Sequence, residues 1–358
     1  MNDAHAADAG PASAPAPEAA SAPSSGSAGA PNRRSSPRLV AAGTVRTLAY
    51  ALLVALALAG LGLTLAGLAG RQSWLAELTT HFRMQLGLGL GAVGLMLGLA
   101  RSTGLATAAL VGGALNMMVL LPHYLPVSDP SATDARPLRV LLANVDHTSR
   151  DHAAAVSVVV KERPDVAVLL EITDEWLAGI EPLRAEYPGW VAVSREDAYG
   201  LAIIARVPIR TADTVALGEL ALPAIVAELE VGAVGLSLVA AHLPPPLRPA
   251  AAAERNRQMA ELAIAARSRR APLVLCADLN SSPWSPYFGD LVDGAGLRDA
   301  ARGFGLQPTW PAAWPRLLMI PIDHCLVSPD VGVRAVRRGP KTGSDHLPLL
   351  VDLAVPRR

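Results

Sequence analysis

The chain has 358 residues, and its 31 basic and 31 acidic side chains give a formal net charge of zero. A protein without excess positive charge lacks the bulk attraction to polyanions that nucleic-acid binding uses, so nucleic acid is not the default partner. The two cysteines, Cys276 and Cys325, are too few for a disulfide framework and lack the close spacing of a zinc or redox motif.

The first 36 residues consist mainly of Ala, Pro, Ser and Gly, with almost no large apolar side chain. Such a segment cannot bury enough surface to offset the entropy that it would lose on ordering. We therefore expect residues 1–36 to form a disordered tail.

An uncharged apolar stretch of about 23 residues follows at 47–69. It is long enough to cross the hydrocarbon core of a bilayer as a helix. A buried soluble helix and a cleaved signal peptide are the alternatives. Against both, the stretch is longer than the ~7–15 apolar residues of a signal peptide, and it follows a long polar leader.

Two shorter apolar runs, 84–100 and 105–121, are separated only by residues 101–104, which predicts a tight helical hairpin. The many glycines of the first run permit close helix packing but also weaken the helix. A single re-entrant element is therefore the alternative to two spans. We expect residues 37–126 to form a membrane anchor with about three transmembrane helices.

The arginines near the first apolar run indicate the orientation of the anchor. Those that precede the run are Arg33, Arg34, Arg38 and Arg46. Because positive charge favours the cytoplasmic side, they place the N-terminus inside, and three crossings leave everything after about residue 122 outside. Arg71 and Arg83 in the first outer loop reduce this asymmetry. The prediction is a multi-pass inner-membrane protein whose C-terminal part is periplasmic or extracellular.

From residue 136 onward, short apolar runs bounded by Pro, Gly and Asp alternate with amphipathic stretches. This pattern predicts a soluble α/β domain of ~220 residues, which is large enough for a full core. The expected strands are 138–145, 166–171, 201–205, 225–229, 234–242, 273–279, 322–327 and 349–353. The expected helices are about 151–162, 174–186 and 250–268.

Polar side chains recur at the ends of these expected strands, where a sheet releases them into a common cleft. They are Asn144, Glu171, His242, Asp278, Asn280, Asp323, Ser344, Asp345 and His346. Any one of them alone is typical of a turn or a cap. Together, carboxylates, amides and histidines without thiolates form a set suited to a hard cation and to phosphate.

The order LLE, AHL, ADLNSSPWS, IDHCLVS and GSDHLPL resembles the endonuclease/exonuclease/phosphatase superfamily, which includes deoxyribonuclease, AP endonuclease, sphingomyelinase and inositol-polyphosphate phosphatase relatives. ADLN and SDHLP are its most specific pieces, and YGLAIIAR at 199–206 resembles an internal strand of the family. The resemblance implies a four-layered α/β sandwich, with two packed β-sheets flanked by helices. Here this domain would span residues 135–358 and be preceded by transmembrane helices.

The resemblance also implies roles for the acidic and amide residues. Glu171, with Asn144 nearby, would hold a Mg²⁺ or Mn²⁺ ion against the phosphate. Asp278 would orient or deprotonate the attacking water. Asn280 would fix that carboxylate and a phosphoryl oxygen.

Four further residues would complete the site by the same resemblance. His346 would contact the phosphate and stabilise charge in the transition state, with Asp323 holding its imidazole. Asp345 would lie beside a second metal position. His242 would donate to a phosphoryl oxygen or to the leaving group, as in the histidine-bearing nucleases and phosphatases.

Other polar and aromatic residues have simpler expected roles. Cys276 is expected in the core, with a Cys276–Cys325 bridge as the alternative if the domain lies outside the cytoplasm. His324 is expected on the opposite strand face from Asp323, in a structural role. The histidines that fit no constellation, and are expected to be solvated or interfacial, are His81, His123, His147 and His152. The loop tryptophans, which could line the cleft or simply pack in their loops, are Trp284, Trp310 and Trp314.

The resulting functional prediction is a membrane-anchored, divalent-metal-dependent phosphodiesterase or phosphatase that uses in-line attack by water. The expected partners are a lipid bilayer and a phosphoester substrate, which could be a small molecule, a lipid headgroup or a nucleic acid. Dispersed arginines favour the first two over nucleic acid. A nuclease and a catalytically inactive membrane-tethered binding module of the same fold are the alternatives. No protein partner is implied.

Overall fold

The computed structural model describes residues 37–127, 135–269 and 272–357. The expected disordered tail lies outside these residues. Contacts divide the chain into two compact units, residues 1–47 and 48–358. The described part of the first unit is helical, since helix α1 spans Pro37–Ala66.

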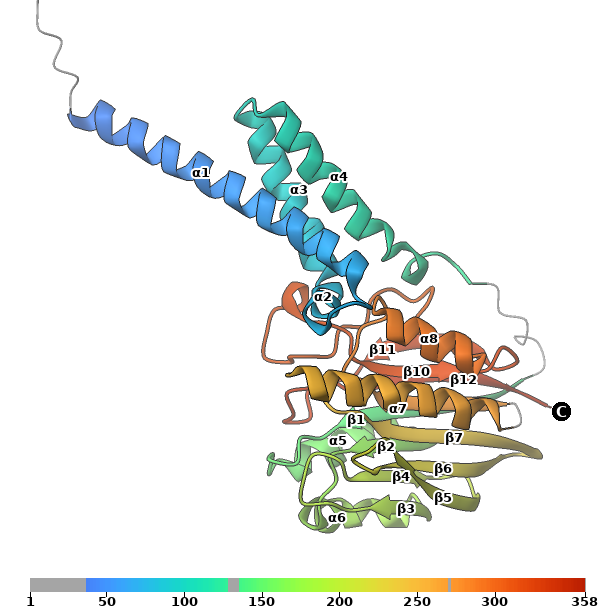
Figure 1. Ribbon diagram of the computed structural model, residues 1–358. Coiled ribbons are helices and arrows are strands. Elements are labelled where there is room, and N and C mark those ends of the chain that lie inside the picture. The colour runs from blue at the N-terminus through green and yellow to red at the C-terminus, as the bar shows by residue number, and fades with distance from the viewer. Residues whose placement is uncertain (1–36, 128–134, 270–271, 358) are drawn as a thin grey trace, which may run out of the picture. The chain divides into compact units, whose positions relative to one another are not determined.

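Apolar helices form the beginning of the second unit (Figure 1). After α1 they are η1 (Gly67–Ala69), α2 (Trp74–Thr80), α3 (Arg83–Leu99), α4 (Thr103–Met118) and η2 (Leu121–His123). α3 and α4 pack side by side at small residues, because a Cβ on Gly87 would lie 2.7 Å from Met117 Sδ. Two helical segments, Gly43–Ala69 and Thr103–His123, are long and apolar enough to span a membrane. The bent pair α2–α3 would be a third span if counted as one.

Two six-stranded mixed sheets make up most of the remaining chain. The first has the order β11-β12-β1-β2-β4-β3 and the second the order β5-β6-β7-β8-β10-β9. The strands of the first sheet are β1 (Ala135–Asn144), β2 (Val166–Leu170), β3 (Gly189–Val193), β4 (Leu201–Ala205), β11 (Gly332–Arg338) and β12 (Leu349–Pro356). Those of the second are β5 (Ile209–Leu217), β6 (Leu222–Val231), β7 (Val234–His242), β8 (Leu273–Asp278), β9 (Arg298–Asp299) and β10 (Asp323–Val327). The pairs β1–β2 and β7–β8 are parallel.

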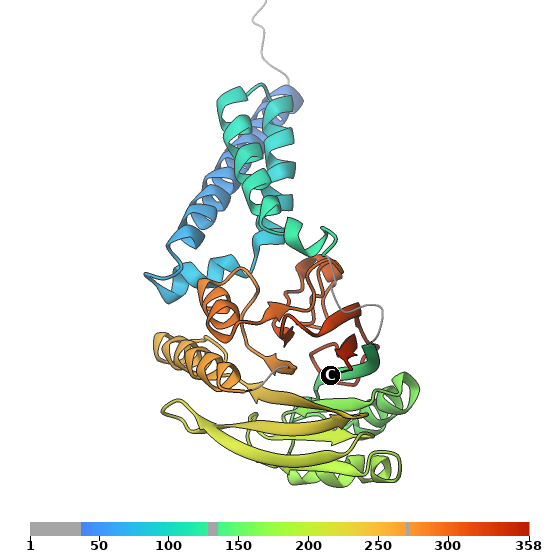
Figure 2. The same ribbon diagram turned by 90° about the vertical axis from the view of Figure 1, so that its right-hand side faces the viewer.

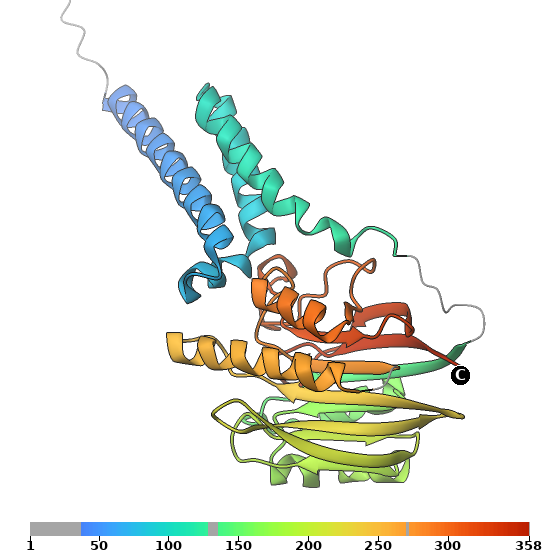
Figure 3. The same cartoon turned by 45° about the vertical axis from the view of Figure 1, so that its right-hand side comes forward.

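Helices cover the outer face of each sheet. They are α5 (His152–Glu162), α6 (Asp174–Ile180), η3 (Glu181–Ala185), α7 (Pro249–Arg267) and α8 (Pro286–Ala295). A further short helix, η4 (Arg316–Leu318), lies between β9 and β10 and has no buried residue. α5 and α6 pack on the first sheet, and α7 and α8 pack on the second (Figures 2 and 3). The result is a helix–sheet–sheet–helix sandwich, which confirms the expected fold.

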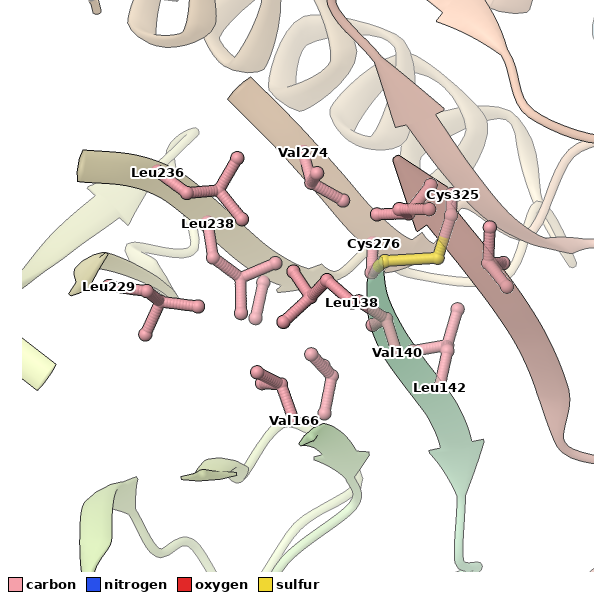
Figure 4. Packing of buried hydrophobic residues seen from close by; sticks show 14 of the residues in the cluster. Leu138, Val140, Leu142, Val166, Leu229, Leu236, Leu238, Val274, Cys276 and Cys325 are labelled. Atoms are coloured by element: carbon pink, nitrogen blue, oxygen red, sulfur yellow. A yellow bond between two sulfur atoms is a disulfide. The ribbon is translucent and has the colours of Figure 1, made fainter. Parts of the chain in front are cut away.

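The main core lies between the two sheets, where alternate residues of each strand meet (Figure 4). Val166 of β2 points into this core, while its neighbour Ala167 faces the helical layer. This alternation follows from the period of two in a strand, and the strands read as continuous apolar runs because both faces are buried. Cys276 and Cys325 face each other across β8 and β10 and form a buried disulfide. The structure therefore contains the Cys276–Cys325 bridge that the sequence left open as an alternative.

All eight strands expected from the sequence are present, and each is an interior strand of its sheet. The strands that the sequence did not predict are β3, β5, β9 and β11, and these are the four sheet edges. Edge strands are partly exposed, so they need no buried apolar run and leave little sequence signal. The expected helix 174–186 is divided into α6 and η3, where Pro182 interrupts the α-helical hydrogen bonds.

Candidate active site

Strand ends from both sheets meet at one end of the sandwich. The parallel pairing of β7 with β8 sets His242 opposite Asp278, and antiparallel pairing sets Asp323 opposite the same aspartate. In the other sheet, β1 ends at Asn144 beside the end of β2. Sheet register therefore accounts for most of the proximity among the candidate residues.

Asn144 connects the two sheets. Its Nδ2 donates to Glu171 Oε1 at 2.8 Å and lies 3.3 Å from Asp278 Oδ2, and its side chain is buried. Its Oδ1 accepts the backbone N–H of Asp146 at 3.0 Å. A single amide thus links the carboxylates of Glu171 and Asp278.

Glu171 belongs to a first acidic group with Asp146 and His147, in which potential metal-ligand atoms lie within 4.8 Å of one another. Glu171 Oε2 accepts from the backbone N–H of His147 at 3.1 Å and lies 2.6 Å from its Nδ1. Burial acts to raise the pKa of Glu171, but the charge of His242 and hydrogen bonds from His147 and Asn144 lower it below its usual value. The group therefore favours an ionised carboxylate.

The expectation that His147 fits no constellation is wrong, because its ring lies against Glu171, with the side chain 32% exposed. Asp146 was not singled out from the sequence either. Both residues lie two and three positions after the end of β1, so their position close to Asn144 was the available signal. Their partner Glu171 follows a different strand, β2, so the contact can be seen only in the folded structure.

A second group consists of the buried residues Asp278, Asp323 and His346, with ligand atoms within 4.8 Å of one another. His346 Nδ1 lies 2.8 Å from Asp323 Oδ2, and His346 Nε2 lies 3.8 Å from Asp278 Oδ2. Burial acts to lower the pKa of His346, but the charges of Asp323, Asp278 and Asp345 and the hydrogen bond to Asp323 raise it to about 10. Burial and the charge of Asp323 raise the pKa of Asp278. The imidazole is thus held as a cation beside an aspartate that readily accepts a proton.

His242 and Asn280 complete this end of the sandwich. His242 Nδ1 lies 2.7 Å from the carbonyl oxygen of Ala198, and its Nε2 lies 3.4 Å from Asp278 Oδ2. The backbone N–H of Asn280 donates to Asp278 Oδ1 at 2.9 Å, and its Nδ2 donates to the carbonyl of Leu243 at 2.8 Å. The carboxylate expected to orient water is therefore held on both oxygens.

Three residues at this end have left-handed backbone conformations, with φ of 60° at Asp146, 66° at Glu171 and 47° at Asn280. Such conformations are costly for residues other than glycine, and they persist where the surrounding structure enforces them. Their gathering around one cluster is typical of a functional site.

Asp345 does not join either group among the described residues. Its Oδ2 accepts from Trp310 Nε1 at 2.9 Å, and its Oδ1 lies 3.9 Å from His346 Nε2. Its side chain is 56% exposed. The role of Asp345 as a metal ligand stays a prediction.

The remaining histidines are more buried than the sequence indicated. His324 Nε2 donates to the carbonyl oxygen of Ser281 at 2.8 Å, on the side of β10 away from the cluster, as expected. The solvated or interfacial role expected for His81 and His123 is wrong, because both are buried within the second unit. His152 packs edge-on against the ring of Trp176.

A groove of about 630 Å³ lies beside the cluster, since Tyr199 lines it and its ring centroid is 5.4 Å from that of His242. Leu247, Arg248 and Arg257 also line the groove. It offers apolar surface and the cation of Arg248 next to the candidate residues, whereas Arg257 is paired with Glu219 at 2.6 Å and Glu254 at 3.1 Å in the same lining. Of the loop tryptophans, Trp310 borders the cluster through Asp345, whereas Trp284 packs near His123.

The donor set fits a hard divalent cation. Carboxylate oxygens dominate both groups, and among the described residues both cysteines are used in the disulfide. Mg²⁺ prefers oxygen ligands, while Mn²⁺ also accepts imidazole. The low pKa of Glu171 keeps it in the ionised form that metal binding requires.

Comparison with known proteins identifies the family and supports the fold. A model of the endonuclease/exonuclease/phosphatase family matches residues 141–346, more than half of the chain. Among solved structures, the chain is similar to an endonuclease/exonuclease/phosphatase from Beutenbergia cavernae, with 22% identity and a TM-score of 0.53 over 62% of this chain and 72% of that one. Humanised TDP2 from D. rerio has 17% identity and a TM-score of 0.52 over 61% of this chain and 98% of its own. The catalytic domain of human Nocturnin has 18% identity and a TM-score of 0.50 over 62% of this chain and 96% of its own.

At these identities the solved structures establish likeness of fold alone, and a search of curated proteins finds no match. The fold and the clustered polar residues define an α/β sandwich with a polar candidate site at one end. Within that class, the family match shows that the chain belongs to the endonuclease/exonuclease/phosphatase family, whose members hydrolyse phosphoester bonds.

Proposed function

We propose that the protein is a membrane-anchored, divalent-metal-dependent phosphoester hydrolase that uses in-line attack by water. The observation that carries the proposal is the hydrogen bonding of Asn144 to both Glu171 and Asp278, which joins a metal-binding group to a water-activating group. This arrangement supports metal binding by one group and activation of the attacking water by the other, beside the same phosphate.

Glu171 would hold Mg²⁺ or Mn²⁺, and Asp146 and His147 join it as candidate ligands because their ligand atoms lie within 4.8 Å. When bound, the metal would neutralise negative charge on the phosphoryl oxygens. Asn144 orients the Glu171 carboxylate by donating to it at 2.8 Å. Asp345 stays a proposed neighbour of a second metal position.

Asp278 would orient the attacking water and accept its proton, a role that its raised pKa favours. Protonated His346, oriented by Asp323, would stabilise charge on the phosphoryl group. Asn280 and His242 would donate to a phosphoryl oxygen or to the leaving group. These roles need no covalent intermediate.

We also propose that residues 37–126 form the anchor and residues 135–358 the hydrolase domain, at the inner membrane with the hydrolase outside the cytoplasm. The Cys276–Cys325 disulfide supports this orientation, because disulfides persist in oxidising compartments. A C-terminal alkaline-phosphatase fusion should be active and a cytoplasmic fluorescent reporter dark. The reverse result would place the hydrolase in the cytoplasm.

The loop beside the site favours a substrate presented at a bilayer. Trp314, Leu317 and Leu318 are 57%, 61% and 47% exposed. Gln85 in the first turn of α3 donates from Nε2 to the carbonyls of Leu317 at 3.0 Å and Met319 at 3.1 Å. This loop therefore lies at one end of an apolar helix, where exposed aromatic and aliphatic side chains suit a membrane surface. A lipid phosphoester is favoured over a nucleic acid.

Turnover by the full chain in detergent tests the proposal. We expect hydrolysis of bis-p-nitrophenyl phosphate or p-nitrophenyl phosphate that requires Mg²⁺ or Mn²⁺ and is abolished by EDTA. A folded protein that binds the metal but turns over neither compound, nor phospholipid in mixed micelles, nor single-stranded DNA would support the inactive binding module instead. Preferential cleavage of DNA would support the nuclease.

A further inference from the structure

A buried glutamate from the segment between α1 and α3 contacts the residues behind the active site. Glu77 of α2 has no exposed surface. Its carboxylate oxygens each lie 2.5 Å from Arg255 Nη2, and one accepts from Ser285 Oγ at 2.6 Å. Arg255 on α7 is also fully buried. The pair is separated by 178 residues in the sequence.

Arg255 extends this contact to the candidate active site. Its Nη1 donates to the carbonyl oxygen of Asn280 at 3.0 Å. Asn280 has a φ of 47°, a conformation that needs support from its surroundings in a residue other than glycine. Asn256 Oδ1 also accepts from Arg255, from Nε at 3.1 Å and from Nη2 at 2.8 Å. Glu77 thus supplies the charged partner of the guanidinium that holds the Asn280 backbone in place.

The backbone of Asn280 in turn determines where its side chain points. Its Nδ2 donates to the carbonyl of Leu243 at 2.8 Å and lies 3.5 Å from His242 Nε2. Rotation of this peptide would carry the amide away from His242 and from the place where a phosphoryl oxygen would bind. The guanidinium is the contact that opposes such a rotation at the carbonyl end.

A second contact from the same segment holds the next residues of the loop. His81 Nδ1 accepts the backbone N–H of Ser282 at 3.2 Å and lies 2.9 Å from its Oγ. Both side chains are buried. The loop that follows Asn280 is therefore held at Ser282 by His81 and at Ser285 by Glu77.

Fold stability does not by itself account for the charged pair. Taking a glutamate and an arginine out of water is costly, and apolar residues of similar volume are often as stable. An apolar pair could not hold a carbonyl oxygen at 3.0 Å. The geometry is explained if the charge serves to direct Arg255 toward Asn280.

We infer that Glu77 is a positioning residue of the hydrolase: through Arg255 it places the side-chain amide of Asn280 for catalysis. The segment between the first two apolar helices is then part of the catalytic unit as well as of the anchor. This inference rests on the proposed function of Asn280. It goes beyond that function because it assigns a role to Glu77, which no motif in the sequence links to the site.

Glu77→Gln in the full chain in detergent tests the inference. The amide keeps the size and a bond to Ser285 but loses the charge that fixes Arg255. We expect kcat on bis-p-nitrophenyl phosphate to fall about tenfold, since removing a transition-state donor altogether costs ~100-fold or more and this change only misplaces one. KM and the Mn²⁺ concentration for half-maximal rate should stay unchanged. Arg255→Lys should give the same pattern, because one ammonium cannot bridge Glu77 and the carbonyl.

Arg71→Gln is the matched control on the same segment. Arg71 pairs with Asp290 through side chains that are 59% and 53% exposed, and such surface pairs contribute little. We expect its kcat to match wild type. Equal losses in the control and in Glu77→Gln would overturn the inference, because they would show a general effect of loosening the segment.

Two further readouts separate positioning from simple destabilisation. In an Asn280→Ala background, Glu77→Gln should cause little additional loss of kcat, whereas losses that multiply would overturn the inference. Selective ¹⁵N labelling of the six asparagines lets the Asn280 side-chain amide be followed by NMR. That resonance should shift in Glu77→Gln and stay in place in Arg71→Gln.

The NMR result does not depend on turnover. A wild-type protein without metal-dependent turnover would count against the proposed function. An Asn280 resonance that is unchanged by Glu77→Gln would count against the positioning role, whether or not the protein is active.

Discussion

His346 Nδ1 lies 2.8 Å from Asp323 Oδ2, with both side chains buried. Burial alone would lower the pKa of His346, but the neighbouring carboxylates raise it to about 10. A group with a raised pKa stays protonated below that value and loses its proton as the pH rises through it. The imidazole is therefore a cation over the whole neutral range.

We expect the rate to be insensitive to His346 titration below about pH 9 and to fall as the pH passes about 10. Asp323→Asn keeps the size but removes the charge that raises the pKa, so the alkaline fall should move to lower pH. The pH profile of kcat/KM measures this shift. An alkaline limb that stays in place would show that the two side chains do not cooperate.

Glu171→Gln and Asp278→Asn should fail in different ways. Glu171 lies in the group suited to the metal, so its amide variant should bind Mg²⁺ or Mn²⁺ more weakly and recover part of its rate at high metal concentration. Asp278→Asn removes the proposed base, so kcat should fall ~100-fold or more with no recovery. Metal titrations of the rate distinguish the two. Equal rescue of both variants would mean that their roles have been confused.

Gly200→Ala should destabilise the protein. A Cβ at this position would lie 1.8 Å from the carbonyl oxygen of Ile172, a backbone atom that follows Glu171 and has little freedom to move. We expect a loss of about 3 kcal/mol in the free energy of unfolding. Gly289→Ala is the control, because no atom lies within 4 Å of its added Cβ and alanine favours the helix α8 by about 0.5–1 kcal/mol. Thermal unfolding in detergent compares the two, and an unchanged midpoint for Gly200→Ala would contradict so close an approach of the two backbone segments.

The Cys276–Cys325 bridge predicts that the protein isolated from its native host without reductant has no free thiol. Alkylation under denaturing conditions should modify neither cysteine until a reductant is added, as measured by mass spectrometry. Because the bridge closes a loop of 49 residues, Cys276→Ala with Cys325→Ala should lower the free energy of unfolding by about 2–4 kcal/mol. Two free thiols in the native protein would argue for a reducing compartment.

The interior strands, the family and most of the polar residues at the candidate site could be predicted from the amino-acid sequence. Asp278 and His346 could be singled out because they stand next to apolar runs, which mark buried strands through their composition alone. The edge strands β3 and β5 gave no such signal, since they are partly exposed.

The contacts between side chains from distant segments could be seen only in the folded protein. His147 contacts Glu171, which follows the strand β2, and Glu77 contacts Arg255, 178 residues away. Local patterns report burial and periodicity along the chain, whereas these contacts depend on how strands register and helices pack. The sequence did not settle the cysteine pairing for the same reason: the pairing depends on the register of β8 and β10, which places Cys276 opposite Cys325.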